Sequence, residues 1–515
     1  MDVEWPHLSL WSLLAIPFFY YTYELLVVRR LAHQPFPLIG NPSFLTPTSI
    51  LNLFFAFKAE RIINAGYQKF KNCAFQFIRN DGQAVVLPLD VIEELSSLPP
   101  SVASANEGLE HDLLGKYTGL DLILDSRMHH SIVQRKLTPR LGRLTPSLEQ
   151  ELVAALKDGF PACEVWTEIK PYQLLAKVSA RLSARTLVGP TMSRDARWLD
   201  ISVNYVENLI LRLLPGFLQP ILCYLLPSYW KCYTYIRYAK ALLGPRIDSL
   251  LRKGEQESWT PDTNSEEHMN VLSWLADAAK GRDRNPDVLA HIEVLLALAS
   301  VHTTLLRMVN VLYDLTANPI YVPQILAEIY HEKEQGWTSS SYSRLSKLDS
   351  ILRESQRLSP PTTLGMKRLF KQPHTFQNGI HIPANTYICL PTFAIENDPE
   401  HTQNPSTFDG LRSWRLRQRH HTDSSSKEAM ESEFHQFTSV EPTVLNFGYG
   451  KTACPGRFFA ALVLKILFVK LLEDYEFRFL EGKGRPRNIQ MHEFLFPWPW
   501  DRIEVRKRVE SSSPF

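Results

Sequence analysis

The longest apolar helix candidate limits most strongly what this chain can fold into. Between Pro286 and Asn318 the sequence reads PDVLAHIEVLLALASVHTTLLRMVNVLYDLTAN, with proline in the first position and Asn-Pro at the end, a pattern typical of helix boundaries. A helix that is apolar on almost every side needs protein around it. The segment therefore predicts a helix through the middle of a large domain, for which the 515 residues of the chain suffice.

The centre of this helix is polar. Ser300, His302, Thr303 and Thr304 lie close together, and buried hydroxyl and imidazole groups reduce stability unless they find partners. Two interpretations are open. Either the threonine hydroxyls bond to carbonyls of the preceding turn, or the four residues form a polar notch that faces a ligand.

Composition excludes several classes of protein. Apolar residues make up 44% and charged residues 21% of the chain, which is ordinary for a globular protein and argues against wholesale disorder. The formal net charge of +2 gives no electrostatic reason to expect a nucleic-acid partner. The six cysteines form no CxxC pair, so we expect neither a disulfide framework nor a structural zinc site, and a reducing compartment fits.

The N-terminal segment predicts a membrane anchor. Residues 8–28 carry one charge, Glu24, and as a helix they would measure roughly 31 Å, enough to cross a hydrocarbon core. Arg29 and Arg30 follow at once, so the positive-inside rule places the rest of the chain on the cytosolic side. A cleaved signal peptide is the alternative, but the acidic start and the missing small-residue cleavage pattern weigh against it.

Behind the anchor the sequence predicts one large, mostly helical domain with small β-sheets. Short strands are expected within 74–88, 376–391 and 474–482. A proline-punctuated apolar stretch at 213–230 either dips into the bilayer surface or packs over the core. The predicted divisions are a membrane anchor at 1–30, a proline-rich spacer at 31–45 and the domain at 46–515.

The stretch LNFGYGKTACPGRFFAALVLKILF places Cys454 in a glycine- and proline-rich loop before an apolar helix. A helix that begins near Arg457 brings backbone N–H groups and the positive end of a helix dipole close to the thiol, and both lower a thiol pKa. A lone buried cysteine is ordinarily a small hydrophobic residue. The flanking pattern, with Phe447 as an apolar cover, favours instead a thiolate that serves as an axial metal ligand.

Two further stretches carry charged residues at informative spacing. Glu354 and Arg357, in ILRESQRLSPP, lie three positions apart and share a helix face. An exposed ion pair of little energetic weight is the alternative. Arg412, in NPSTFDGLRSWRLR, is a candidate partner for the Glu354 carboxylate, because a planar guanidinium suits that contact better than lysine.

Taken together, these stretches resemble the cytochrome P-450 superfamily of haem-thiolate monooxygenases over almost the whole chain. HTT, FDGLR and ACPGRFFA are similar to filamentous-fungal members, many of which oxidise terpenoids, indole-diterpenes or meroterpenoids in secondary metabolism. The family's Phe-x-x-Gly-x-x-x-Cys-x-Gly signature matches at Phe447, Gly450, Cys454 and Gly456, its Glu-x-x-Arg motif at Glu354 and Arg357, its later arginine at Arg412 and its oxygen-activation threonine at Thr303.

The resemblance implies a helical P-450 domain that binds haem b with Cys454 as the axial ligand of the iron. Arg135, in QRKLTPRL, and Thr452 would bind the haem propionates. Thr303 would deliver protons to oxygen, with His302 modulating that delivery. Glu354, Arg357 and Arg412 would lock the core behind the haem.

Four positions depart from the family pattern. Ser300 replaces the usual glycine of the helix kink, and His302 replaces the usual acid, as in the fungal relatives. Thr452 stands where an arginine or histidine usually holds a propionate, and Ser131 stands where a tryptophan usually precedes the propionate arginine. None of these changes removes the thiolate.

The implied reaction is NADPH-dependent insertion of one oxygen atom of O₂ into a lipophilic substrate at the endoplasmic reticulum membrane. The chain has no GxGxxG fingerprint in a strand–helix context, so electrons are expected from a separate NADPH-cytochrome P-450 reductase in the same membrane. A haem-thiolate isomerase, dehydratase or desaturase is an alternative. A further alternative is a non-catalytic haem-binding protein in which His302 fills the second axial position.

An apolar substrate pocket is expected, because a lipophilic substrate would enter from the bilayer. The sequence does not name that substrate, the carbon attacked or the number of oxidations. The segments expected to line the pocket are 103–125, 206–218, Leu295, Leu296, Ala299, 361–366 and 493–496.

Overall fold

The computed structural model describes most of the chain behind the predicted anchor. The predicted membrane span at 8–28 lies almost wholly outside the described residues, so it stays a prediction. Within the described part, one helix, Pro286–Ala317, is long and apolar enough to cross a membrane, and it is mostly buried inside the protein. The described residues are 15, 18–19, 21–23, 35–41, 43, 45–79, 82–205, 211–213, 218–253, 265–422 and 434–509.

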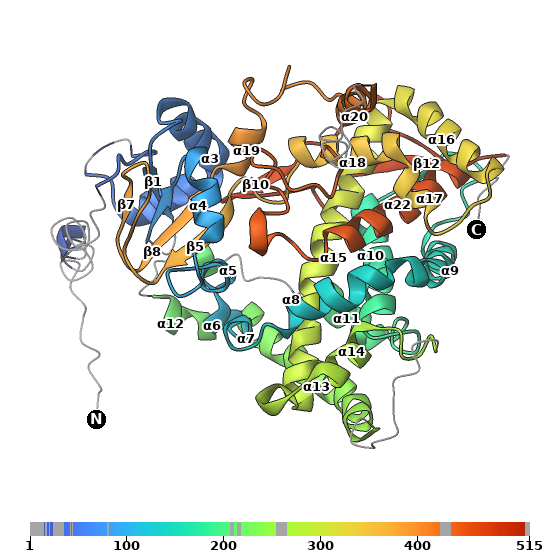
Figure 1. Cartoon of the computed structure of the whole chain (residues 1–515), viewed down its shortest axis with the longest axis horizontal. Helices are drawn as coiled ribbons and strands as arrows, with labels where there is room; N and C mark the ends of the chain where they lie inside the picture. The colour runs from blue at the N-terminus through green and yellow to red at the C-terminus, as the bar shows by residue number, and fades with distance from the viewer. Residues whose placement is uncertain are drawn as a thin grey trace, which may run out of the picture.

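That helix, α15 (Pro286–Ala317), runs through the middle of the molecule, as its sequence predicts (Figure 1). Its N-terminus is capped by Asn285, whose side chain accepts the N–H of Asp287 at 2.8 Å. Pro286 occupies the first turn, where its missing N–H has no intrahelical role. The helix ends one residue before the predicted Asn318, where Pro319 follows.

Most of the longer helices share one large apolar core with α15, whereas the short helices α4 (Ile92–Ser97) and α19 (Thr392–Glu396) contribute to a second apolar core. The longer ones are α9 (Leu141–Gly159), α10 (Pro171–Leu187), α11 (Ala196–Asn204), α13 (Pro227–Lys253), α14 (Val271–Ala278), α16 (Val322–Glu334), α18 (Ser346–Leu358), α20 (Arg412–Thr422) and α22 (Arg457–Asp474). The shorter ones are α4 (Ile92–Ser97), α5 (Ala105–Leu113), α6 (Gly115–Thr118), α7 (Leu122–Asp125), α8 (Met128–Ile132), α12 (Gln219–Leu222), α17 (Ser341–Arg344) and α19 (Thr392–Glu396).

Small sheets accompany the helices, as expected. Each of the three predicted strand regions contains a strand. The largest sheet has the strand order β1-β2-β8-β5-β3. Its strands are β1 (Phe75–Arg79), β2 (Gly82–Val86), β8 (Thr386–Leu390), β5 (Gly365–Phe370) and β3 (Ala103–Ser104). The other strands are β4 (Thr167–Ile169), β12 (Ile503–Lys507) and β9 (Tyr475–Arg478) in one sheet, β10 (Ile489–Met491) with β11 (Phe494–Phe496), and β6 (His374–Thr375) with β7 (His381–Ile382).

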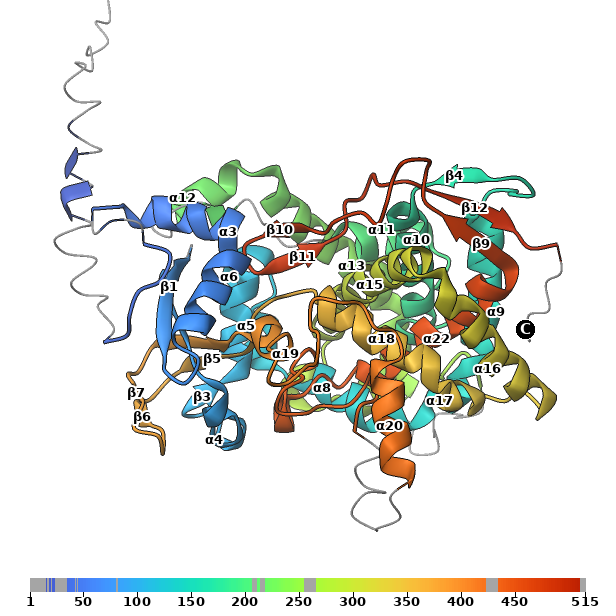
Figure 2. The same cartoon turned by 90° about the horizontal axis from the view of Figure 1, so that it is seen from above.

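The helix α3 (Thr48–Lys69) packs on the largest sheet at the end of the molecule opposite α9 and α16 (Figure 2). Gly66 allows this close approach, because a Cβ atom there would lie 2.3 Å from the ring of Phe75 on β1. The backbone of α3 is non-helical at Lys58, with φ −135° and ψ 21°, so the helix kinks at that residue.

Candidate active site

Cys454 lies at the end of a tight loop that the sequence prescribes. The loop passes through the 3-10 helix η9 (Gly450–Thr452), and α22 begins three residues after the cysteine. Gly450 has φ +63°, and a Cβ atom there would lie 2.9 Å from Cβ of Ser96, so only glycine fits without a shift. The N–H of Cys454 donates to the carbonyl of Phe447 at 2.7 Å, which fixes the half-buried thiol on the loop.

Phe447 and Gly456 complete the motif around this thiol. The ring of Phe447 packs edge-on against Phe437, with 5.2 Å between centroids, and therefore anchors the loop in the large core. Gly456 immediately precedes α22, and a Cβ atom there would lie 3.9 Å from the sulfur of Cys454.

The electrostatics of Cys454 differ in part from the prediction. Burial raises the pKa of the thiol, whereas hydrogen bonds from the N–H groups of Gly456 and Arg457 and the charge of Arg457 lower it. The pKa remains above its ordinary value, so the helix start acts in the expected direction but does not outweigh burial. A metal cation held by Cys454 would stabilise the thiolate, because coordination deprotonates a thiol outright.

The middle of α15 has an exposed face although the helix lies inside the protein. Ala299 and Thr303 are exposed, whereas Val301 and Thr304 beside them are buried. Because α15 is covered by other helices, exposure at its centre means that these two side chains face an internal opening. The hydroxyl of Thr303 donates to the carbonyl of Ala299 at 2.6 Å, so the local bonding and the notch interpretations both hold for this residue.

The other polar residues of the notch contact neighbouring helices. Ser300 lies 2.6 Å from the hydroxyl of Ser183 on α10. His302 is hydrogen-bonded to the backbone of Tyr205, directly after α11, and burial lowers the pKa of His302. The hydroxyl of Tyr205 in turn donates to the carbonyl of Thr118 at 2.6 Å. His302 is therefore neutral, and it connects α15 to the residue that follows α11.

A buried arginine that sequence reasoning missed lies beside the cysteine loop. Arg368 on β5 donates to the hydroxyl of Thr452 at 2.6 Å and is 5% exposed. Burial lowers the pKa of Arg368 to about 10, and within the described residues it forms no ion pair with a carboxylate. A buried cation without a carboxylate is costly, which suits an anionic group beside Thr452. The signal in the sequence was the position of Arg368 between Met366 and Phe370, because alternate residues of a strand share one face and the two apolar neighbours indicate the buried one.

The predicted propionate ligand Arg135 has a different setting. It is exposed on the π-helical turn Val133–Leu137, and the described residues offer it no hydrogen bond to Thr452. His130, on α8, lies closer to the loop, because its ring is hydrogen-bonded to the backbone of Ala453. The structure therefore brings Thr452 together with Arg368 rather than with Arg135.

The structure brings Glu354, Arg357 and Arg412 together in a buried cluster. Arg357 contacts the Glu354 carboxylate at 2.7 and 3.0 Å, and Nε of Arg412 reaches it at 3.2 Å. Glu354 is 2% exposed, so the surface ion-pair alternative does not apply. Arg357 also donates to the carbonyls of Pro405 at 2.7 Å and Thr407 at 3.3 Å, which ties the irregular segment before α20 to α18.

The segments expected to line an apolar pocket also contain charges. Leu295 and Leu296 are apolar and buried as expected. In contrast, Asp112 pairs with Arg79 at 2.8 Å, and Glu493 pairs with Lys367 at 3.1 Å. Burial alone would raise the pKa of both carboxyl groups, but Lys367 and Arg79 hold each below its usual value. These buried ion pairs place charges within the segments expected to line the pocket, and the apolar pocket itself stays a prediction.

Comparison with known proteins decides the family. The sequence model of the family Cytochrome P450 matches residues 126–505. The chain belongs to the cytochrome P450 family. It is 35% identical over 481 residues to the cytochrome P450 monooxygenase AN1598 of Emericella nidulans, covering 92% of this chain and 88% of that protein. It is 33% identical over 483 residues to the ent-kaurene oxidase of Gibberella intermedia, again covering 92% and 88%.

Two further likenesses agree with this membership. The cytochrome P450 monooxygenase paxP of Penicillium paxilli is 35% identical over 479 residues, with 90% of this chain and 88% of that protein covered. The retinoic acid bound cyanobacterial CYP120A1 superposes with a TM-score of 0.64 at 18% identity, covering 89% of this P450 and 96% of that chain. The structural likeness supports the mostly helical fold with small sheets, and the sequence relatives identify a monooxygenase of fungal secondary metabolism.

Membership in the P450 family implies a haem-thiolate iron, and the residues present fit it. Cys454 offers a half-buried sulfur on a rigid loop. The exposed centre of α15 at Ala299 and Thr303 offers an internal opening. Arg368 offers a buried cation without a carboxylate partner in the described part of the chain, as a haem propionate requires.

Proposed function

We propose that this P450 is a membrane-attached monooxygenase that transfers one oxygen atom of O₂ to a lipophilic terpenoid substrate. The net reaction is RH + O₂ + NADPH + H⁺ → ROH + H₂O + NADP⁺. The half-buried thiol of Cys454 carries the proposal, on a loop fixed by the hydrogen bond from the Cys454 N–H to the carbonyl of Phe447 at 2.7 Å. Electrons come from NADPH through a separate NADPH-cytochrome P-450 reductase.

Cys454 would hold the haem iron, and Phe447, Gly450 and Gly456 would shape the loop that presents the sulfur. When bound, a haem with a thiolate ligand supplies the activation of O₂, because the thiolate pushes electron density toward O–O cleavage. Arg368 and Thr452 would bind one propionate, and His130 lies near enough to the loop to assist. Arg135, the earlier expectation, is the competing propionate ligand.

Thr303 would hold and pass a proton at its Oγ1 atom. In the structure this hydroxyl donates to the carbonyl of Ala299 at 2.6 Å while its side chain faces the opening. A rotation about the Cα–Cβ bond would exchange that bond for one to a group in the opening. His302 is neutral and bonded to the Tyr205 backbone, so it would position the helix rather than supply the proton.

Glu354, Arg357 and Arg412 would hold the segment before α20 in place and keep the cysteine loop rigid. The buried carboxylate accepts from both arginines and from the N–H of Asp409 at 3.0 Å. A network of charge-assisted hydrogen bonds of this kind is rigid. The three residues would therefore stabilise the fold and take no part in the chemistry.

A terpenoid substrate is proposed because one relative is named an ent-kaurene oxidase and because Leu295 and Leu296, four and three residues before Ala299, give its helix face an apolar character. Indole-diterpene and meroterpenoid intermediates belong to the same lipophilic class. Feeding a panel of such compounds to cells that express the protein with a reductase would identify the substrate by the oxidised product.

Attachment to the endoplasmic reticulum membrane, with the catalytic domain in the cytosol, is supported by exposed apolar side chains. Ile221 and Leu225, around α12, are 66% and 74% exposed, and Trp230 at the start of α13 is 56% exposed. Exposed apolar groups of this size suit the boundary between headgroups and acyl chains. Residues 218–230 would rest there.

The ligand assignment is tested by the spectrum of the reduced protein with carbon monoxide. We expect the red-shifted Soret band of thiolate ligation, and we expect Cys454→Ala to abolish it. Cys389→Ala, at another buried cysteine, is the matched control and should retain the band. An unchanged spectrum in Cys454→Ala would reject Cys454 as the ligand.

A further inference from the structure

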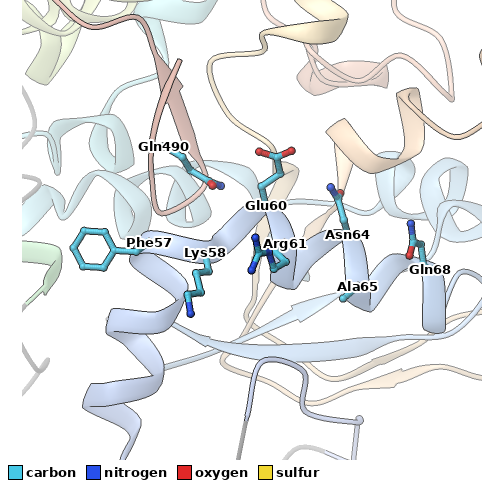
Figure 3. Close-up of a pocket in the computed structure, with 8 residues that line it drawn as sticks. All are labelled: Phe57, Lys58, Glu60, Arg61, Asn64, Ala65, Gln68 and Gln490. Carbon is cyan, nitrogen blue, oxygen red and sulfur yellow. The ribbon is translucent and has the colours of Figure 1, made fainter. Parts of the chain in front are cut away.

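A surface cavity on α3 combines cationic and amide groups that the proposed reaction does not use. The cavity has a volume of about 670 Å³ and lies where α3 kinks beside β10 (Figure 3). Its lining residues are Phe57, Lys58, Glu60, Arg61, Asn64, Ala65, Gln68 and Gln490.

The two cations of this cavity are open to an anion, although Nζ of Lys58 also lies 5.5 Å from the ring centroid of Phe54. Lys58 and Arg61 are exposed and lie one turn apart, and among the described residues neither forms an ion pair. Gln490 extends from β10 toward the kinked turn of α3 (Figure 3), and its side-chain nitrogen is buried without a hydrogen-bond acceptor in the described part of the protein. Two exposed cations and an unused buried donor that share a cavity suit an anionic acceptor.

The exposed face of α3 changes character at the same point. Ile50, Leu53 and Phe57 follow one another at helical spacing and are 40%, 43% and 63% exposed. One turn later the lining becomes polar, with Arg61 and then Asn64. A helix face that is apolar at one end and cationic at the other suits the boundary between acyl chains and headgroups.

We propose that this cavity binds the headgroup of a single glycerophospholipid, whose phosphate is held by Lys58, Arg61 and Gln490. The acyl chains would lie along Leu53 and Phe57. The carboxylate of Glu60 also lines the cavity, which favours a headgroup with an ammonium, such as ethanolamine, over a phosphate alone. The site rests on the proposed membrane attachment and gives it a chemical contact outside the predicted anchor.

The start of α3 gives this site a connection to the substrate region. Asn52 donates to the backbone carbonyl of Arg212 at 3.2 Å, and Arg212 lies in a segment expected to line the substrate pocket. The backbone N–H of His492 donates to the carbonyl of Ala56 at 2.8 Å, which ties the β10–β11 turn to the turn of α3 that precedes the cavity. A lipid on α3 would therefore hold the helix from which both of these contacts arise.

Native mass spectrometry of the detergent-purified, full-length holoenzyme tests the proposal. The probe is dihexanoylphosphatidylethanolamine, and the comparison ligands are dihexanoylglycerol, which lacks the phosphate, and inorganic phosphate. We expect one retained molecule of the phospholipid, no comparable retention of dihexanoylglycerol, and no displacement by an equal concentration of inorganic phosphate. The double variant Lys58→Gln with Arg61→Gln should lower occupancy about tenfold.

The control variant, Lys157→Gln with Lys177→Gln, removes the same two charges from exposed positions on α9 and α10 and should leave occupancy unchanged. Equal occupancy in the α3 variant, equal retention of dihexanoylglycerol, or displacement by inorganic phosphate would each overturn the proposal. The carbon monoxide spectrum, recorded on the same samples, keeps the two hypotheses apart. An intact thiolate band without lipid retention rejects the lipid site alone, whereas lipid retention without that band rejects the haem-thiolate assignment alone.

Discussion

The ring of His302 on α15 is hydrogen-bonded to the backbone of Tyr205 at the end of α11. Tyr205 continues the connection, because its hydroxyl donates to the carbonyl of Thr118 at 2.6 Å. His302 therefore connects α15 to the end of α11 and, through Tyr205, to the carbonyl of Thr118. It does so as a neutral group, since burial lowers its pKa.

His302→Ala should weaken substrate binding more than it slows turnover. The change leaves a backbone carbonyl near Tyr205 without its partner, which costs about 1–3 kcal/mol locally, and frees the end of α11. We expect KM to rise about tenfold with a smaller change in kcat, and His302→Asn, which keeps a donor, to recover part of the loss. Steady-state kinetics on the identified substrate measure both. A fall in kcat alone, with hydrogen peroxide release, would return His302 to the proton pathway.

Thr303→Ala should separate NADPH consumption from product formation. The variant removes the one hydroxyl of α15 that is both exposed to the internal opening and bonded locally, to Ala299. We expect NADPH consumption to continue with peroxide release and little product. Thr316→Ala, which removes a hydroxyl bonded to the carbonyl of Leu312 near the end of the same helix, is the control. Coupling equal to that of the wild type in Thr303→Ala would rule out proton delivery by Thr303.

The sequence predicted best those features that depend on residues close together in the chain, such as helix ends and contacts within one helix. The bounds of α15 followed from Pro286 and the Asn-Pro at its end, because proline acts on the turn where it stands. The Glu354 and Arg357 contact followed from helical spacing. Arg368 was missed because a basic residue on the short strand β5 reads as surface until the cysteine loop packs over it. The pKa of Cys454 was misjudged for a related reason, since the extent of burial is a tertiary property.

The buried charges around Asp112 and Glu493 were beyond reach of any local pattern. Their partners Arg79 and Lys367 come from β1 and β5, far away in the sequence. Each segment taken alone shows only charges that an exposed segment would also carry. Only the assembled fold brings opposite charges together and excludes water from them.

Glu354→Gln should destabilise the protein strongly. It removes the buried charge that holds Arg357 and Arg412, and breaking one partner of a buried ion pair costs about 3–5 kcal/mol. We expect this loss in the free energy of unfolding, measured with urea on the purified holoprotein. Arg502→Gln breaks an exposed pair with Glu168 at 2.5 Å and should cost about 1 kcal/mol or less. Similar losses in both variants would show that the cluster has no special role.

Arg368→Gln should lower haem retention, whereas Arg135→Gln should not. Arg368 is buried beside Thr452, while Arg135 is exposed on its π-helical turn. We measure the ratio of haem absorbance to protein absorbance after gel filtration, and we expect it to fall at least about threefold in Arg368→Gln, as loss of one charge-assisted contact implies. Loss of haem in Arg135→Gln with full retention in Arg368→Gln would restore the assignment made from sequence.

Acidification should destabilise the folded protein through its buried histidines. Burial lowers the pKa of His129 from its ordinary value of 6.5 to about 4, and burial also lowers the pKa of His302. The unfolded chain therefore binds more protons below pH 6.5, so stability is full above that pH and is lost as the pH falls toward 4. For His129 alone the loss at pH 5 is about 2 kcal/mol. Urea unfolding at pH 7, 6 and 5 should show this decline, and His129→Gln should flatten it. His401→Gln, at an exposed histidine, is the control. A decline of equal steepness in His129→Gln would show that other groups carry the acid sensitivity.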